Sequence, residues 1–317
     1  MSDQRSMVEA LVSPRLGRNQ RLEALNNLID WSVVGRLAKK IRPGETGRPP
    51  YDGLSMAKAL YLQALYNLSD TELEEALGDR VSFRRFCGFG LEVETPDSTT
   101  ICRFRQAAAE RKVMEACFEA INKQLDAKGL VTRKGTLMDA TIVAAQHNRP
   151  PIEAGKGASH PKEPDADWTY KGGKSYFGYK IHVGMDMGGI VRRMVMTPAK
   201  TYESEVADAL ISGDEHAVYG DRAYPSKQRR ETLKRLGIKD RIMHRADKWH
   251  PVLPKWKQRH NALISRRRAP VEAVFSALKR FYGMRRARYA NLLTNAGRAF
   301  AALTMLNLCR ANAMSPP

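Results

Sequence analysis

At Gly129 the sequence changes from one hydrophobic periodicity to another, and this change limits the folds that the chain can adopt. Before Gly129, segments such as LSMAKALYLQALY (residues 54–66) carry apolar residues at helical spacing. After it, KGTLMDATIVAAQ (residues 134–146) is rich in β-branched and apolar residues, which is typical of a buried strand. The change predicts two domains, an all-helical one at residues 1–130 and a sheet-containing one at residues 131–317.

The first domain is predicted to consist of short helices and tight turns. The Gly/Pro/Arg cluster at residues 42–50 predicts a loop. Ser69 and Asp70 offer N-caps to a short helix that ends at Gly78, and a long amphipathic helix is expected over residues 97–125. Such a domain is either a helix-turn-helix DNA reader or a helical dimerisation domain, and the sequence favours neither.

The second domain is predicted to contain a mixed sheet with helices on its faces, which places it in the α/β class. A long loop rich in Pro, Gly and charge separates the first strand from the next elements. The elements expected after this loop (147–175) are a hairpin at 179–199 turning at Gly188-Gly189, a helix at 201–212, a strand ending at Asp221, a helix at 225–237, a strand at 238–244, a basic helix with Pro270 near its first position, and a terminal helix at 299–314.

The charge of the chain indicates a polyanionic partner. Lys and Arg number 53 against 34 Asp and Glu, which gives a formal net charge of +19. A globular chain this basic usually meets nucleic acid. No apolar run approaches the ~18 residues of a membrane span, and the N-terminus lacks the apolar core of a signal peptide. The four cysteines form no C-x-x-C pair, so we expect reduced thiols in the cytoplasm, and the lack of an apolar run predicts no membrane association.

Three acids stand out, although each has an ordinary structural explanation. Asp139 lies inside the apolar strand, Asp221 ends a later strand, and Glu272 is the single acid in the basic stretch RRRAPVEAVFSALKRFYGMRRAR. Taken singly, they could be an edge-strand charge, a turn former and a helix-surface charge. If they converge at one edge of the sheet, their mutual repulsion favours a bound divalent cation such as Mg²⁺. Two such ions would clamp the attacking and leaving oxygens of a phosphoryl transfer.

Several basic and aromatic residues are candidate DNA contacts. Arg268 and Lys279 share one side of the basic helix with Glu272, at i−4 and i+7. Trp249 and Trp256 stand among basic residues and either stack on nucleobases or cover the sheet. By contrast, the P-loop-like GGKS at 172–175 does not predict ATP binding, because the Walker pattern lacks its first glycine.

Several motifs together resemble bacterial insertion-sequence transposases of the DDE superfamily, in particular the insertion-sequence-five group. The resemblance extends over nearly the whole chain. Its segments are PPYDGLSMAKALYLQALYNLSDTELEEALGDRVSFRRFCGF, TPDSTTICRFRQ, MDATIVAA, FGYKIHVGMD and YGDRAY. The spacing R-(3)-E-(6)-K, here Arg268, Glu272 and Lys279, is similar to the family signature around its catalytic Glu. Two departures are Ser265, where the wider signature has Tyr, and Ala223, where Gly is common after the second Asp.

The resemblance implies a ribonuclease H-like catalytic domain with Asp139, Asp221 and Glu272 as catalytic metal ligands. It implies two Mg²⁺ (or Mn²⁺) ions, strand cleavage at terminal inverted repeats, and attack of the freed 3′-hydroxyl on target DNA. Two DNA ends must be brought together, so a homodimer or larger assembly is expected on DNA. The candidate DNA contacts are Arg268, Lys279, Arg222, Arg103, Arg105, Lys174, Lys180, Trp249 and Trp256.

Two alternatives of other classes stay open at this point. One is a ribonuclease H-like nuclease that cuts without joining strands. The other is a DNA-binding regulator whose α/β domain is not catalytic. A metal-dependent nicking assay and a strand-transfer assay separate the three possibilities.

Overall fold

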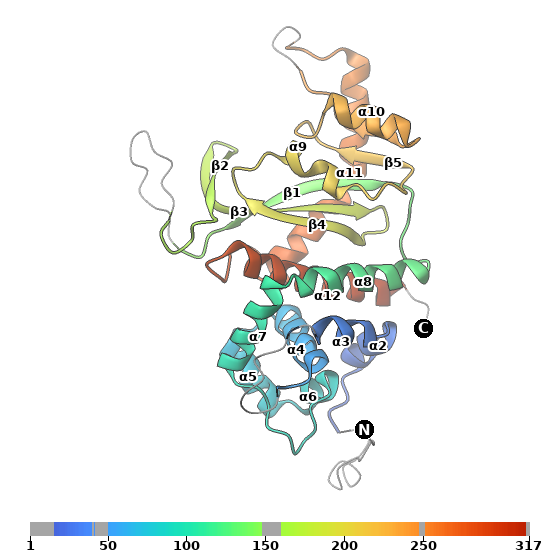
Figure 1. The fold of residues 1–317 in the computed structure, drawn as a ribbon. Helices are drawn as coiled ribbons and strands as arrows, with labels where there is room; N and C mark the ends of the chain where they lie inside the picture. The colour runs from blue at the N-terminus through green and yellow to red at the C-terminus, as the bar shows by residue number, and fades with distance from the viewer. Residues whose placement is uncertain (1–15, 40, 42–49, 148–159, 247–250, 315–317) are drawn as a thin grey trace. The chain divides into compact units, whose positions relative to one another are not determined.

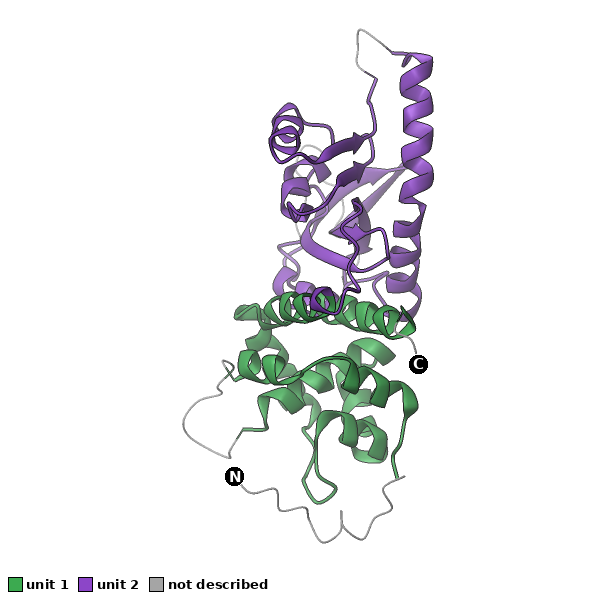
Figure 2. Ribbon diagram, turned by 90° about the vertical axis from the view of Figure 1, so that its right-hand side faces the viewer, with its two compact units in different colours: residues 1–125, 300–317 green, residues 126–299 purple. Residues whose placement is uncertain are grey.

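The computed structural model describes residues 16–39, 41, 50–147, 160–246 and 251–314 (Figure 1). The chain forms two compact units (Figure 2), residues 1–125 with 300–317, and residues 126–299. The expected boundary at residue 130 lies close to the observed one, but residues 300–317 belong to the first unit, not to the second. The ring of Phe300 packs against that of Phe118 at a centroid distance of 5.4 Å, which explains this assignment.

The first unit is all-helical in its described part, as the apolar spacing predicts. Its central helix is α4, in which every residue from Ser55 to Leu65 is buried. Trp31 makes edge-on contacts with Tyr61 and Phe86, both at centroid distances of 5.7 Å. The helices of this unit are α2 (Gln20–Leu28), α3 (Ser32–Ala38), α4 (Gly53–Tyr66), α5 (Asp70–Asp79), α6 (Val81–Cys87), α7 (Ser98–Glu110), α8 (Val113–Ala127) and the later part of α12 (Leu292–Met314).

The predicted helix starts of this unit are confirmed, whereas the predicted continuous helix over residues 97–125 is wrong. Ser69 and Glu72 form a reciprocal capping box at α5, and the Asp97 side chain caps α7. After Glu110 the chain turns, and Lys112 adopts a left-handed backbone conformation with φ +51° before α8 begins. That conformation ends an α-helix, so one amphipathic pattern covers two helices.

The second unit is built on a mixed six-stranded sheet, which confirms the predicted α/β class. Strand β3 runs antiparallel to β1, β2 and β4, whereas β5 is parallel to both β1 and β6. The strand order β2-β3-β1-β5-β6, with β4 also paired to β3, places β1 in the middle of the sheet. The strands are β1 (Thr136–Ala144), β2 (Asp167–Lys171), β3 (Lys174–Asp186), β4 (Val191–Pro198), β5 (Ala217–Gly220) and β6 (Lys239–Ile242).

Part of the predicted long loop is a strand. Strand β2 pairs with the first residues of β3, and the hairpin between them turns at Gly172 and Gly173. Both glycines have positive φ, +58° and +77°, which suits a tight two-residue turn. The GGKS segment is therefore a hairpin turn, in agreement with the rejection of a P-loop. Residues 148–159 of the predicted loop lie outside the described residues.

Helices cover both faces of the sheet. Met138 of β1 packs with residues of the 3-10 helix η1 (Ala207–Leu210) and of α10 (Lys227–Arg235), near the short α9 (Glu203–Val206). The next residue, Asp139, points to the opposite face and pairs with Arg268 of α11 (Lys255–Phe281). Alternation along β1 thus gives each helix layer its own set of side chains.

Helix α11 corrects the expected start of the basic helix. It begins at Lys255, and Pro270 lies inside it, not at its first position. The buried residues before Pro270, Asn261 and Ile264, continue the inward face of the helix across the proline. Packing of this face against the sheet outweighs the loss of one backbone hydrogen bond. In the described part of the chain, no helix is long and apolar enough to cross a membrane.

Candidate active site

The sheet brings two of the three predicted acids side by side. Strand β5 pairs with β1 in parallel, with Thr136 opposite Val218 and Leu137 opposite Tyr219. Counting two residues further along each strand places Asp139 level with Asp221. Neighbouring strands lie only ~4.8 Å apart. The observed register therefore agrees with the prediction that Asp139 and Asp221 lie close together in the sheet.

A gap in the sheet lies beside this pair. Strand β5 ends at Gly220, whereas β1 continues to Ala144. At the far end of β1, Ala144 N–H donates to the carbonyl of Arg285 (3.1 Å), and the Ala144 carbonyl accepts from Ala287 N–H (2.7 Å). The edge of β1 between these two pairings is thus free of a neighbouring strand in the described residues. Substrates of open α/β sheets bind outside the carboxyl ends of strands, and this gap lies at such an end.

Asp139 forms an ion pair with Arg268, one of the predicted DNA contacts. Its Oδ2 lies 3.0 Å from Nη2 of Arg268, which also donates to the Met138 carbonyl at 3.3 Å. Burial raises the pKa of Asp139, the Arg268 guanidinium and the Ala140 N–H lower it, and the charge of Asp221 raises it again. Arg268 therefore supplies the positive charge that this pair of aspartates requires. A contact of Arg268 with phosphate stays a prediction.

Glu272 lies on α11 four residues after Arg268, about 6 Å further along the helix axis. Its side chain is exposed. Among the described residues, no group of three or more His, Cys, Asp or Glu side chains is gathered closely enough to hold a metal ion. Mg²⁺ commonly binds through one or two carboxylates plus substrate phosphates, so the Asp139–Asp221 pair fits such an ion by its chemistry. The part of Glu272 in the site stays a prediction.

Sequence reasoning missed a further acid, Glu203, at the start of α9. Its Oε1 lies 4.0 Å from Nζ of Lys180, and its side chain is 18% exposed. Burial raises the pKa of Glu203, and the negative charges of Asp221 and Asp139 raise it further, against the effect of Lys180. The negative charge of Glu203 therefore interacts unfavourably with the charges of both aspartates. The sequence offers no signal for this, because an acid in the first turn of a helix is common.

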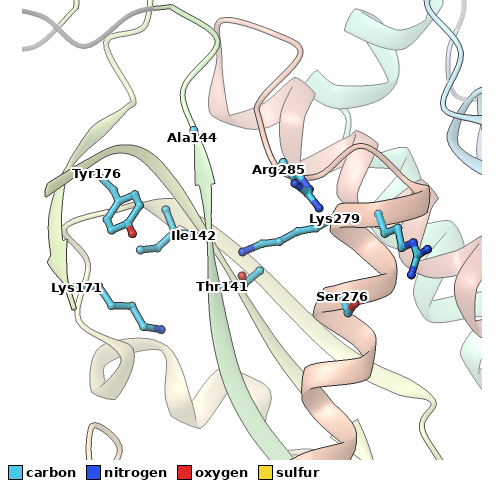
Figure 3. Close-up of a pocket in the computed structure, with 9 residues that line it drawn as sticks. Thr141, Ile142, Ala144, Lys171, Tyr176, Ser276, Lys279 and Arg285 are labelled. Atoms are coloured by element: carbon cyan, nitrogen blue, oxygen red, sulfur yellow. The ribbon is translucent and has the colours of Figure 1, made fainter. Parts of the chain in front are cut away.

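A basic pocket lies in the second unit, along the part of β1 that follows Asp139 (Figure 3). It has a volume of about 720 Å³ and includes Thr141, two residues after Asp139 on the same face of β1. Ser276, four residues after Glu272 on α11, lines the opposite side. The described residues that line it include no acid, and they are Thr141, Ile142, Ala144, Lys171, Tyr176, Ser276, Lys279, Arg280 and Arg285.

Lys279 crosses this pocket from α11 toward β1, as Figure 3 shows. Burial lowers its pKa, and the nearby charges of Lys171 and Arg285 lower it further. These like charges repel one another until an anion joins them. The pocket therefore suits a phosphate group of a DNA strand close to the two aspartates.

Two of the other predicted DNA contacts are contradicted by their burial. Arg105 is 6% exposed, and its Nη1 and Nη2 each lie 2.6 Å from one carboxylate oxygen of Asp70. This bidentate pair joins α7 to α5, so Arg105 is structural. Lys180 is 9% exposed, and its Nζ donates to the Thr201 carbonyl at 3.0 Å. Its ammonium group is thus held inside the second unit by Thr201 and Glu203.

The remaining predicted contacts lie on the surface or outside the described residues. Trp256 is 61% exposed and packs edge-on against His244, which argues against the alternative that it covers the sheet. Trp249 lies outside the described residues. The basic residues Arg103, Lys174 and Arg222, all predicted contacts, are exposed.

Comparisons with known proteins give two family matches and one structural neighbour. The family model described as "Transposase domain (DUF772)" matches residues 11–107, and the model described as "Transposase DDE domain" matches residues 132–308. Among solved structures, the chain is similar to one described as "Crystal structure of a pre-cleavage Mos1 transpososome", with 11% sequence identity and a TM-score of 0.19. That match covers 95% of this chain and 100% of the other. A TM-score this low supports no argument about the site.

Proposed function

Since the chain belongs to the Transposase DDE domain family, whose model matches residues 132–308 of its 317, we propose that it moves an insertion sequence in a defined series of steps. It binds the terminal inverted repeats, cleaves DNA strands at them, and joins the freed 3′-hydroxyl to target DNA. The resemblance to DDE transposases is confirmed by the family match, and with it the ribonuclease H-like α/β class. The chain is thus a transposase, and its family acts with divalent metal ions.

One observation carries the proposal, namely the juxtaposition of the two aspartates and the basic pocket at the gap beside β1. The aspartates offer the hard oxygen ligands that Mg²⁺ and Mn²⁺ prefer. The pocket offers Lys171, Lys279, Arg280 and Arg285, and its Thr141 lies two residues after Asp139 on β1. A phosphodiester held by the pocket would bring its phosphorus next to the aspartates. The net charge of +19 favours the approach of DNA, and we propose that it also keeps the protein near the nucleoid.

We assign Asp139, Asp221 and Glu272 as the ligands of two Mg²⁺ or Mn²⁺ ions. When bound, two such ions activate the attacking oxygen and stabilise the leaving oxygen of an in-line phosphoryl transfer. The protein itself holds the carboxylates in place, releases Arg268 from Asp139, and fixes the DNA backbone with the basic pocket. Arg268, once released, lies near enough to Glu272 to contact a phosphate there. Arg103, Lys174, Arg222 and Trp256 stay proposed contacts further out.

The helical unit is proposed to recognise the repeat DNA or to dimerise. Its exposed Arg103 lies in the second turn of α7, just after the Asp97 cap. Because two ends must meet before both are cut, we propose that the protein acts as a homodimer or larger assembly on DNA. The catalytic role belongs to the second unit, residues 126–299.

An assay with labelled end DNA and a target plasmid tests this function. We expect nicked end DNA and, in addition, a joined product that contains label and plasmid. Cleavage without a joined product would identify a nuclease instead, because hydrolysis needs no target. Specific binding without any nick would identify a non-catalytic DNA-binding regulator.

Replacement of Lys279 by Ala tests the basic pocket. We expect the slope of log affinity against log salt to fall by about 0.9, because one phosphate contact releases about one counterion. Single-turnover cleavage should fall by more than the loss of binding explains, since a lysine beside the reacting phosphate stabilises charge in the transition state. The measurements are salt-dependent affinity and cleavage at saturating protein.

Lys234→Ala is the matched control for this experiment. Lys234 is exposed at the end of α10, outside the pocket. Its replacement should leave the cleavage rate at the wild-type value. If Lys279→Ala shows the same salt slope and cleavage rate as the wild type, the pocket does not hold the scissile strand.

A further inference from the structure

We propose that Arg229 is a positioning residue of the active site, which holds the turn that carries Asp221 in the geometry that a divalent cation requires. This inference rests on the proposed function, because it concerns the assigned ligand Asp221. It goes beyond that function in giving a role to an arginine of α10 whose side chain is only 3% exposed, and which therefore lies away from any DNA surface.

Asp221 begins a tight turn directly after β5. The N–H of Tyr224 donates to the Asp221 carbonyl at 3.2 Å, which closes the turn, and the N–H of Ala223 donates to the Asp221 carboxylate at 2.8 Å. The turn also packs back on the strand, since a Cβ at Gly220 would lie 3.1 Å from the Cβ of Tyr224. The direction of the Asp221 carboxylate thus depends on where the other end of the turn is held.

Arg229 holds that end of the turn from inside the protein. Its Nη1 donates to the Tyr224 carbonyl, its Nη2 to the Ser204 carbonyl at 2.7 Å, and its Nε to the Asp208 carboxylate at 2.7 Å. The guanidinium is planar and presents its donors in a fixed fork. It therefore joins the turn after β5 to α9 and η1 in one geometry.

The ion pair with Asp208 does not by itself explain why Arg229 is buried. The Asp208 side chain is 68% exposed, so an arginine that served only this pair could remain at the surface. Burial of a guanidinium is unfavourable unless its N–H groups are satisfied. The donors that point inward are satisfied by the carbonyls of Tyr224 and Ser204, which places the structural effect of Arg229 on the turn and on α9.

A carboxylate that binds a metal ion must be held within about 0.5 Å of its productive position. Groups that hold a metal ligand from behind commonly change metal affinity by about 10- to 100-fold when they are replaced. Without Arg229, the Tyr224 end of the turn loses its anchor, and Asp221 can adopt more orientations. Divalent cations should then bind more weakly although both aspartates are still present.

The experiment measures Mn²⁺ affinity and not turnover. The full chain is bound to an end duplex that already terminates at the cleaved position, and Mn²⁺ is added while electron paramagnetic resonance reports the free ion. The duplex alone gives the baseline. We expect Arg229→Lys to weaken Mn²⁺ binding about tenfold or more, because an ammonium group has no planar fork for the two carbonyls. A merely structural arginine would change the number of binding sites through unfolding, but not their affinity.

Arg230→Lys is the matched control. Arg230 is the next residue of α10, but it is exposed and pairs with Asp240 of β6 at 3.1 Å, so this variant should bind Mn²⁺ like the wild type. Thermal melts check the fold of each variant. Arg229→Gln, whose amide can still donate to one carbonyl, replaces Arg229→Lys if the latter does not melt cooperatively.

Two results would overturn the inference, and they are distinguishable. If the folded Arg229 variant binds Mn²⁺ as the wild type does, while Asp221→Asn does not, Arg229 serves stability alone and the proposed function stands. If Asp221→Asn also binds Mn²⁺ normally, the metal site of the proposed function fails, and the role of Arg229 fails with it.

Discussion

Asp221→Asn and Asp139→Asn are each expected to lower single-turnover cleavage of end DNA by about 10³-fold or more, because residues that act as a unit fail as a unit. The register of β1 and β5 places these two carboxylates level with each other at the gap in the sheet. Asparagine keeps the shape of each side chain but removes the negative charge that a divalent cation requires. DNA binding should hold or tighten, since a negative charge that faces the phosphates is lost.

The control for these variants is Asp240→Asn. Asp240 lies on β6 of the same sheet and pairs with Arg230 at 3.1 Å. The pair lies at the surface, so its loss should change stability by less than about 1 kcal/mol and leave cleavage unchanged. Thermal melts are needed for Asp139→Asn, because that change leaves the poorly exposed Arg268 without its charged partner. Near-normal cleavage by either aspartate variant would remove that residue from the active site.

The same cleavage assay, applied to Glu272→Gln, tests whether Glu272 is the third metal ligand. Glu272 lies one helical turn from Arg268 and is exposed, so its replacement should not disturb the fold. If it is the third ligand, cleavage should fall as steeply as for the aspartates. Wild-type cleavage would reduce Glu272 to a surface charge and leave the two aspartates as the catalytic acids.

Removal of divalent ions is expected to abolish cleavage and strand transfer completely. The acids alone cannot bring a phosphodiester to reaction, because like charges repel and Arg268 already occupies Asp139. Activity in a chelator-treated preparation should return with Mg²⁺ or Mn²⁺. Ca²⁺ should support DNA binding without cutting, since it accepts looser coordination geometry than Mg²⁺. The measurements are cleavage and gel-shift assays on one preparation dialysed against EDTA.

Two outcomes bear on this expectation in opposite ways. Restoration by Mg²⁺ and Mn²⁺ but not Ca²⁺ would support a site of strict geometry at the two aspartates. Full cleavage in excess EDTA would show that strand cutting proceeds without any metal, and the role assigned to the carboxylates would have to be abandoned.

Much of the fold could be predicted because its signals are local. The Ser69 capping box, the Gly188-Gly189 turn and the end of a strand before Asp221 are set by neighbouring residues. Strand β2 was missed because a stretch rich in Pro, Gly and charge gives no period-two pattern, and its pairing with β3 supplies the stability. The predicted start of α11 is wrong because a proline usually indicates a helix start. Here tertiary packing continues the helix through Pro270.

The positions of the site residues likewise depend partly on local sequence and partly on tertiary contacts. Asp139 is conspicuous in sequence as a charge in an apolar strand, and parallel pairing of β1 with β5 was enough to align it with Asp221. Arg105 could not be recognised as structural, because its partner Asp70 lies 35 residues away in the chain. Glu203 is held beside β3 by Lys180, 4.0 Å away, a contact that no local pattern indicates.

The position of Glu272 within α11 has an electrostatic consequence. The macrodipole of a helix acts through partial charges that are felt within its first and last turns. Glu272 lies 272 − 255 = 17 residues after the first residue of α11 and 281 − 272 = 9 residues before its last. Neither helix terminus is therefore close enough to stabilise the negative charge of this carboxylate through the helix dipole. Its negative potential is left available for cations that arrive from outside the helix.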